Sequence, residues 1–206
     1  MCIRDRRYPD LFVFLLAFLV YNDGVGTIIK MATIYGEEVG IDSGQMIGAL
    51  IVVQLAGIPF TFAFGQLAGR VTAKNGLFVC LLVYSAISAG GYFMSEAWHF
   101  WALAVGVATV QGGIQGLSRS LYASMIPAGR STEFFGFYSV SSKFAGIAGP
   151  LVFAAVGQSM GTSRWGILSL LVFFVAGAAL LTRVDVAAGQ RRAREEASRM
   201  RTKVPA

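Results

Sequence analysis

Charged residues are scarce in this sequence. Asp, Glu, Lys and Arg make up 14% of its 206 residues, whereas soluble domains contain about 25%. Hydrophobic residues make up 55% of the chain, and the mean hydropathy is +0.64. This composition excludes an ordinary soluble domain and predicts a protein that crosses a lipid bilayer several times.

Histidine and cysteine are almost absent. The single histidine, His99, and the two cysteines, Cys2 and Cys80, are too few for the common zinc sites or for an acid–histidine cluster. A phosphate loop of the G-x-x-x-x-G-K type is also missing, so direct use of ATP is not expected. We therefore predict no enzymatic activity, no catalytic residue, no metal site and no cofactor.

Six apolar segments are each long enough to span a bilayer, which takes about 17 to 25 residues. They are Leu11–Tyr35, Gln45–Ala68, Leu77–Met94, Ala97–Leu117, Phe134–Val156 and Trp165–Thr182. The loops between them are short, so spans that follow one another in sequence are expected to be antiparallel neighbours in space. The sequence therefore predicts an all-α membrane protein with six transmembrane helices.

Most of the 17 lysines and arginines lie in alternate loops and in the C-terminal tail. Cytoplasmic loops are enriched in these residues, so we predict that both termini are cytoplasmic. Arg164 is then the one basic residue in an outer loop, and Trp98, Trp101 and Trp165 lie at the outer boundary, where aromatic belts occur. The net charge of +6 thus reflects orientation in a membrane, and we expect no nucleic-acid partner.

The six spans contain a weak internal repeat. A shift of 89 residues places Asn22 on Gln111, Gly24 on Gly113 and Lys30 on Arg119. Three spans repeated in opposite orientation form an inverted repeat, as within each half of a major facilitator transporter. In such folds, glycine-interrupted spans at corresponding positions indicate the binding site, and here these are residues 22–26 and 111–116.

Asp23 lies in the middle of the first span. An acid at the centre of a spanning helix costs at least about 2.5 kcal/mol, so it is a functional candidate. The alternative is that Asp23 pairs with a lysine only to hold helices together, because structural ion pairs also occupy such sites.

The loop after the second span resembles the major facilitator signature G-x-L-A-D-R-x-G-x-K. It reads Gly65-Gln66-Leu67-Ala68-Gly69-Arg70-Val71-Thr72-Ala73-Lys74. Gly69 replaces the acid that pairs charge across the cytoplasmic gate in that family, and Thr72 replaces a glycine. The resemblance makes Gly65, Arg70 and Lys74 candidates for a cytoplasmic gate loop, and the alternative is a basic turn that only obeys the orientation rule.

Three segments sharpen the resemblance. Residues 21–30, 111–120 and 133–144 are similar to the major facilitator branch that contains fungal vacuolar amino-acid effluxers linked to autophagy and their bacterial relatives. The similarity spans Leu11 to Arg183 and implies the C-terminal six-helix half of a twelve-helix transporter, in the bacterial inner (plasma) membrane. Residues 1–10 are then a cytoplasmic leader or a truncated central loop, 11–183 the transmembrane half, and 184–206 a basic cytoplasmic tail.

The resemblance implies a secondary active transporter that moves a small polar solute, such as an amino acid, by alternating access. Its expected partners are the lipid bilayer, a missing N-terminal six-helix half and a small-molecule substrate. Two alternatives remain open: a structural or assembly membrane protein, and a six-helix subunit that works as a homodimer.

Polar residues within the spans are the candidates for a substrate or proton pathway. They are Asn22, Asp23, Lys30, Gln54, Gln111, Gln115, Ser139, Ser142 and Lys143. The amides among them fit interhelical hydrogen bonding equally well. Ser139, Ser142 and Lys143 are followed at helical spacing by Gly146 and Pro150, which predicts one polar stripe along the fifth span.

Asp23, Gln54 and Lys143 are expected near the bilayer midplane, at a rise of 1.5 Å per residue. We therefore hypothesise that Asp23 couples transport to protons, with Lys143 as its partner in one state. Lys30 lies two turns beyond Asp23 on the same face, which is too far for a direct pair, and it could extend toward the outer surface.

Overall fold

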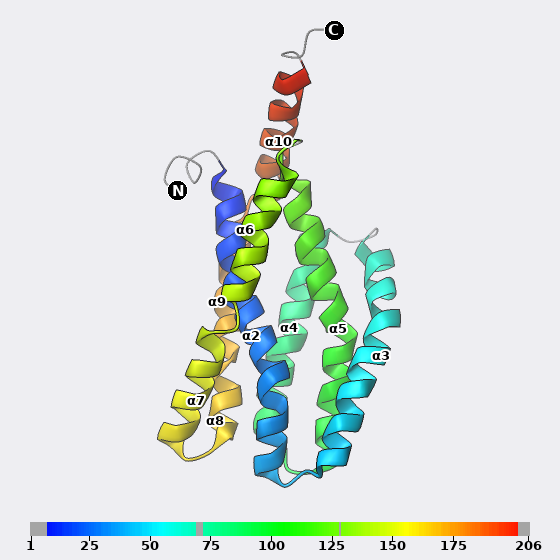
Figure 1. The fold of residues 1–206 in the computed structure, drawn as a ribbon, viewed down its shortest axis with the longest axis vertical. Helices are drawn as coiled ribbons and strands as arrows, with labels where there is room; N and C mark the ends of the chain where they lie inside the picture. Colours follow the sequence, from blue (N-terminus) through cyan, green and yellow to red (C-terminus); the bar gives the residue numbers. More distant parts are fainter. Residues whose placement is uncertain (1–7, 69–71, 128, 202–206) are drawn as a thin grey trace.

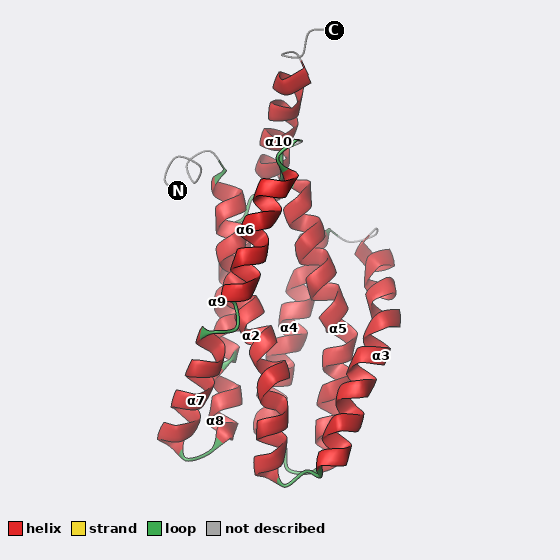
Figure 2. Cartoon of the chain, viewed as in Figure 1, coloured by secondary structure: helices red, strands yellow, loops and turns green. Residues whose placement is uncertain are grey.

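The computed structural model describes residues 8–68, 72–127 and 129–201. All regular structure in these ranges is helical, and none of these residues lies in a strand (Figure 2). The helices are α2 (Pro9–Val39), α3 (Ser43–Ala68), α4 (Ala73–Tyr92), α5 (Ala97–Ser124), α6 (Ser131–Phe144), α7 (Ala148–Met160), α8 (Ser163–Ser169), α9 (Leu171–Thr182) and α10 (Val186–Arg201). The all-α prediction is confirmed.

Within the described residues, six helical segments are long and apolar enough to cross a membrane. The helices α2, α3, α4 and α5 each form one span, α6 with α7 forms the fifth, and α8 with α9 forms the sixth. The predicted number of spans is therefore confirmed.

The spans alternate in direction (Figure 1). The starts of α2, α4 and α6 lie at one end of the bundle, together with the ends of α3, α5 and α9. The α2–α3, α4–α5 and α7–α8 loops lie at the opposite end. This arrangement agrees with the predicted topology, and the assignment of the first end to the cytoplasm stays a prediction.

Cysteine labelling in intact cells tests that assignment. In a background with Cys2 and Cys80 replaced by alanine, we expect an impermeant thiol reagent to label Asp42→Cys and to miss Asn75→Cys. Both positions are exposed, one in the α2–α3 loop and the other in the first turn of α4. The reverse labelling pattern would contradict the predicted orientation, and labelling of both positions in broken cells is the control for reactivity.

Helix contacts between the two repeats follow the inverted repeat. In the first repeat, α3 and α4 both pack against α5, the first helix of the second repeat. In the second repeat, α6, α7 and α9 pack against α2, the first helix of the first repeat. The third spans meet each other, α4 against α8 and α9. Exchanging the two repeats therefore leaves these contacts unchanged, as the sequence repeat predicts.

The fifth span, predicted over Phe134–Val156, is confirmed as a span, but it consists of two helices where the predicted polar stripe assumed one. α6 ends at Phe144 and α7 begins at Ala148, and Gly146 between them has a φ of +114° that favours glycine. Pro150 lies in the first turn of α7, where its missing N–H costs nothing. In a continuous helix its ring would clash with the carbonyl of Gly146, so the polar stripe does not continue past Lys143.

Aromatic side chains fill the core between α2, α5 and α6. Phe18 of α2 stacks on Tyr138 of α6 with ring centroids 4.3 Å apart, and Tyr138 lies 5.2 Å from the ring of Tyr122 in α5. Phe14 of α2 stacks on the same Tyr122 at 5.9 Å. These buried rings fix α6 against α2 at the end of the bundle where both helices begin (Figure 1).

The basic tail predicted after residue 183 forms α10, which extends beyond the bundle (Figure 1). Asp185 caps its start by accepting the Ala188 amide at 2.9 Å, and this hydrogen bond holds the pKa of the Asp185 carboxyl below its ordinary value. Arg192 forms a 2.6 Å ion pair with Asp10 at the start of α2. The tail is therefore attached to the bundle at its base.

Candidate functional site

Asp23 is buried where α2 passes the break between α6 and α7. Only 1% of the surface of Asp23 is exposed to solvent. Three backbone amides donate to the carboxylate: Gly146 at 2.7 Å and Gly149 at 3.0 Å to Oδ1, and Ala148 at 3.1 Å to Oδ2. The candidate site is thus built from one carboxylate and the first turn of a half-helix.

Helix geometry explains this arrangement. The first amides of a helix have no partner within the helix, and they form the positive end of its dipole. Ile147, which precedes the first helical residue of α7, has no side chain able to accept a hydrogen bond, and no side-chain cap occurs there. Asp23 supplies the cap from another helix, and its charge strengthens the hydrogen bonds.

Close backbone approach makes the contact possible. A Cβ on Gly149 would overlap Thr27 Oγ1, and it would lie 2.9 Å from Asp23 Oδ1. The Thr27 hydroxyl itself donates to the Asp23 carbonyl at 2.7 Å. Any side chain at residue 149 would therefore push α7 away from α2.

The two lysines in the spans, Lys30 and Lys143, lie beside this break. The Lys30 ammonium is 2.9 Å from the place where a Cβ on Gly146 would stand, so the side chain folds back to the break and does not extend outward. Lys143 is exposed in the last turn of α6. Among the described residues neither lysine forms an ion pair with Asp23, so the hypothesised Asp23–Lys143 pair is not present in this conformation.

The candidate amides bond between helices. Gln115 of α5 donates to Asn22 Oδ1 of α2 at 2.9 Å, and the Tyr84 hydroxyl of α4 donates to Gln111 Oε1 at 2.7 Å. The structure therefore brings Asn22 and Gln115 together. Gln54 is exposed on α3, and it has no hydrogen bond within the described part of the chain.

The candidates of α6 have local partners only. The Ser142 hydroxyl donates to the Ser139 carbonyl at 2.8 Å, one turn back in the same helix. Ser139 is exposed and Ser142 is half-buried. Any serine in a helix can form this local hydrogen bond, so the predicted role of Ser139 and Ser142 in a substrate or proton pathway stays a prediction.

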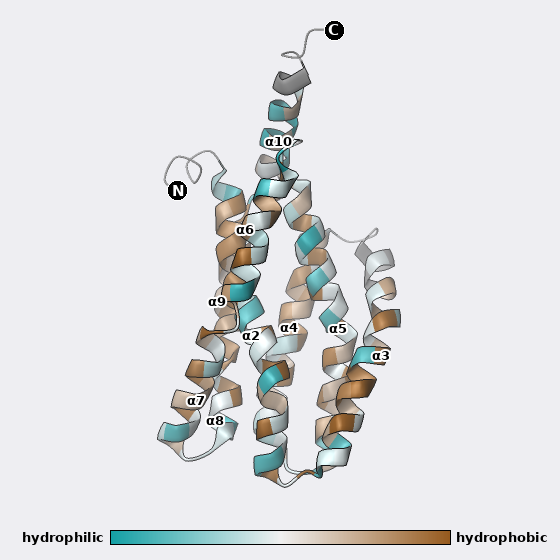
Figure 3. Ribbon diagram, viewed as in Figure 1, coloured by the Kyte–Doolittle hydropathy of each residue, from teal (hydrophilic) through white to brown (hydrophobic). Residues whose placement is uncertain are grey.

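Polar residues of α2, α5 and α6 share one open face, visible as teal segments on these helices in Figure 3. Lys30, Gln115, Ser139 and Lys143 are exposed. A methyl group added to Gly26 on α2, Gly116 on α5 or Gly136 on α6 would meet no atom within 4 Å, so space is open beside these glycines. Polar side chains at membrane depth face water, solute or protein in preference to lipid, so we call this the open polar face.

The candidate gate loop has a structural contact at one of its three residues. Lys74 donates to the Val184 carbonyl at 2.8 Å and to the Thr182 carbonyl at 3.2 Å, where its charge also complements the C-terminal end of α9. Gly65 is exposed near the end of α3, and Arg70 lies outside the described residues. A role of the loop in gating stays a prediction.

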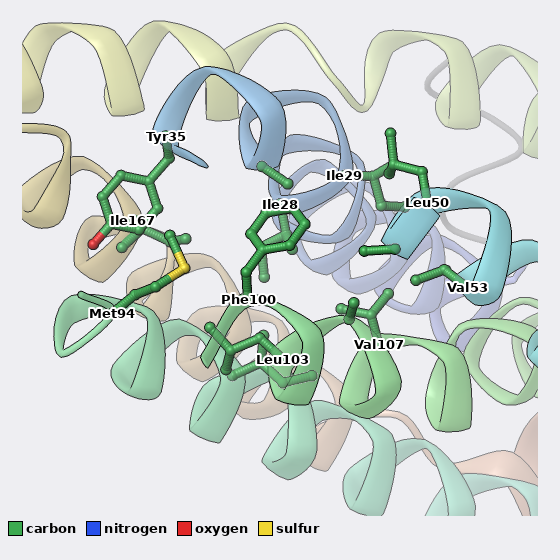
Figure 4. A pocket seen from close by; sticks show the side chains of 14 residues that line it. Ile28, Ile29, Tyr35, Leu50, Val53, Met94, Phe100, Leu103, Val107 and Ile167 are labelled. Atoms are coloured by element: carbon green, nitrogen blue, oxygen red, sulfur yellow. The ribbon is translucent and has the colours of Figure 1, made fainter. Parts of the chain in front are cut away.

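A separate cavity of about 70 Å³ is entirely apolar. It lies between α2, α3, α4, α5 and α8, and Figure 4 shows Ile28, Phe100, Leu103 and Ile167 pointing into it. None of the sequence-predicted site residues lines it. The cavity therefore offers no polar group to orient a solute, and the candidate site lies at Asp23 and the open polar face.

Sequence reasoning selected Asp23 but missed its partners. These are the amides of Gly146, Ala148 and Gly149, with Thr27 beside them. A signal was available, because Gly146 and Pro150 together indicate a broken helix. The amides themselves have no signature in the sequence.

A comparison with known families decides the identity. The family model described as "Vacuole effluxer Atg22 like" matches residues 2–194. The chain belongs to this Atg22-like family. It is similar to the uncharacterized MFS-type transporter YxiO of Bacillus subtilis, with 46% identity over 86% of the chain and 42% of that protein.

Fungal members are more distant. Autophagy-related protein 22 of Cryptococcus neoformans is 29% identical over 95% of the chain and 39% of its own length, and autophagy-related protein 22-1 of Neosartorya fischeri is 22% identical over 92% and 34%. No solved structure matches the chain. The chain thus spans about a third to two fifths of the length of these relatives. The family is described by efflux and the Bacillus subtilis relative by transport, which agrees with the prediction that the chain is not an enzyme.

Proposed function

We propose that this chain is the C-terminal six-helix half of a secondary active transporter that moves a small polar solute by alternating access. Membership of the Atg22-like family supports transport, and the share of the relatives that the chain covers supports a half. The inverted-repeat packing is the kind on which rocking between two states depends. We place it in the bacterial inner membrane with both termini in the cytoplasm, and amino acids stay the solute class that the resemblance implies.

The observation that supports coupling to protons is the cap that Asp23 forms on α7. An ionised carboxylate only accepts hydrogen bonds and suits three N–H donors, whereas a protonated carboxyl presents an O–H donor of its own. Protonation of Asp23 would remove the charge that strengthens these three hydrogen bonds, and the protonated oxygen would be a weaker acceptor than before. It would therefore weaken the hold of α2 on α7 and let the two half-helices of the fifth span separate from it.

We propose Lys143 as the second partner of Asp23. It is exposed in the last turn of α6, next to the break. If the cap opens in the other state of the transporter, Lys143 is the partner to which the Asp23 carboxylate would turn. One proton would then bind Asp23 when the cap opens and leave it when the carboxylate pairs with Lys143 or returns to the α7 amides.

Transport itself can be tested directly. The product of the complete reading frame, purified and placed in lipid vesicles, is expected to accumulate a polar solute when a pH gradient is imposed. Without the gradient it should still exchange labelled for unlabelled solute. Vesicles that do neither, with any of a broad set of amino acids and organic acids, would contradict the proposal.

One observation favours a second function, that of a structural or assembly membrane protein. Asn22, Gln111 and Gln115 are bonded to other helices, which is what interhelical hydrogen bonding alone would give. The vesicle assay above tests this alternative, because a purely structural protein would transport no solute. Reading the DNA upstream of Met1 separates the full transporter from a half-length subunit: six more spans in frame would support the full transporter. A stop codon and promoter there would favour a six-helix subunit that works as a homodimer.

A further inference from the structure

Positive charge is unbalanced on the open polar face. Lys30 of α2 and Lys143 of α6 are both exposed, and neither has an ion-pair partner among the described residues. Arg119 of α5 is exposed as well and interacts electrostatically with Tyr138 of α6. Cations from three helices thus lie along α6 and the break that follows it.

The acids of these helices offset only part of this charge. Asp23 is buried and accepts three backbone amides, but these neutral donors do not cancel the charge of a carboxylate, so Asp23 offsets one of the three cations. Glu133 lies in the first turn of α6, ten residues or about 15 Å along the helix from Lys143. The face is therefore positive at the depth of the break.

Membrane energetics requires these lysines to have a counter-charge or water. A lysine that faces lipid at the bilayer centre costs about 2.5 to 3.5 kcal/mol on insertion scales, and long side chains usually avoid this by extending to the surface. Lys30 does not extend, because its ammonium lies beside Gly146 in the break. In the ranges that the structure describes, the Asp23 carboxylate accepts the amide of the same Gly146 without forming an ion pair with Lys30, so a further negatively charged group would still stabilise the two lysines.

Neutral donors surround the same place. Asn22, Gly26 and Lys30 follow one another at intervals of four residues, so they share one face of α2, and no atom lies within 4 Å of a methyl group built on Gly26. Ser139 and Lys143, four residues apart, share a face of α6. Helix α6 packs against α2. Amide, hydroxyl and ammonium groups beside open space are suited to a carboxylate or phosphate.

We infer that the solute taken by the open polar face is an organic anion, a molecule whose carboxylate or phosphate is not balanced by an ammonium group of its own. This inference rests on the proposed transport function and narrows its solute class. A neutral amino acid would leave the excess positive charge of this face unbalanced, because its own ammonium group already offsets its carboxylate.

Matched pairs of solutes test the inference on the purified full-length protein. The pairs are glutamate and glutamine, succinate and succinamide, and glycerol 3-phosphate and glycerol. We expect at least one anion to raise the unfolding temperature in a saturable way while its neutral partner does not. In Lys30→Gln with Lys143→Gln, the apparent affinity should fall about tenfold or more for each charge-assisted hydrogen bond lost.

Control variants separate binding from general charge effects. Arg191→Gln removes an exposed cation from α10 and should leave the affinity unchanged, and Lys30→Arg with Lys143→Arg should retain binding. A neutral partner that binds as well as its anion, or an unchanged affinity in the glutamine variant, would overturn the inference. A third outcome would also overturn the inference. If no anion in the panel raises the unfolding temperature and the glutamine variant is less stable than the parent, an acid of the N-terminal half is the counter-charge of the two lysines.

Transport in vesicles distinguishes failure of the inference from failure of the proposed function. If glutamine is transported as fast as glutamate, the anion preference is wrong and the transporter assignment stands. If neither these six solutes nor the broad set of amino acids and organic acids is transported under a pH gradient or in exchange, the transport function itself is contradicted, and the inference with it.

Discussion

Replacing Asp23 by asparagine is expected to abolish accumulation of solute under a pH gradient while exchange across the membrane survives. Asparagine keeps one acceptor oxygen, which can still accept the Gly146 and Gly149 amides that now bond Oδ1. Its NH2 group would face the Ala148 amide, which now donates to Oδ2. The variant therefore retains part of the cap, but it has no proton to gain or lose.

The measurement is solute uptake into vesicles that contain the complete protein. For Asp23→Asn we expect accumulation to fall to the level of empty vesicles. Asp42→Asn is the matched control, because Asp42 is an exposed acid that accepts the Gly44 amide in the α2–α3 loop, and it should accumulate solute like the parent. Parental accumulation in Asp23→Asn would show that Asp23 is not the coupling site.

A third outcome would identify a purely structural role. If Asp23→Asn loses both accumulation and exchange, and both return in the double variant with Lys143→Gln, the two residues only hold helices together. The unfolding temperature of each variant should be measured alongside uptake, since loss of a charge-assisted hydrogen bond costs about 1.5 to 3 kcal/mol.

Gly149→Ala is expected to lower the stability of the protein by about 1 to 3 kcal/mol, the usual cost of overpacking a tight contact. The added methyl group would overlap Thr27 Oγ1 and press on the Asp23 carboxylate. α7 would have to move away from α2, which lengthens the hydrogen bonds of the cap. The measurement is the unfolding temperature of the purified protein in detergent.

Two further variants make this prediction specific. Gly26→Ala, on the same helix as Asp23 but beside open space, should be neutral or stabilising, because alanine exceeds glycine in helix propensity by about 1 kcal/mol. Thr27→Ala removes the overlapping oxygen and should restore part of the stability of Gly149→Ala in the double variant. Equal unfolding temperatures for Gly149→Ala and the parent would contradict the close α2–α7 contact.

The sequence by itself determined the number and order of the spans, and it selected Asp23 as a candidate. Long apolar segments can bury their backbone polar groups in a bilayer only as helices, so six such segments predict six helical spans whatever their packing. The cost of a charge at mid-span singles out Asp23 before any partner is known. The inverted repeat was visible in Asn22 and Gln111, and the packing of α3 and α4 on α5 and of α6, α7 and α9 on α2 follows it.

Only the tertiary structure decided what Asp23 binds. Its partners lie 123 or more residues away in the chain, and they are backbone amides, which every residue except proline possesses. Such donors become available only where a helix begins, so the break at Gly146 had to be located before the contact could be inferred. The sequence suggested a lysine as partner because side-chain charges can be read from residue types, whereas the free amides of a half-helix arise from the fold.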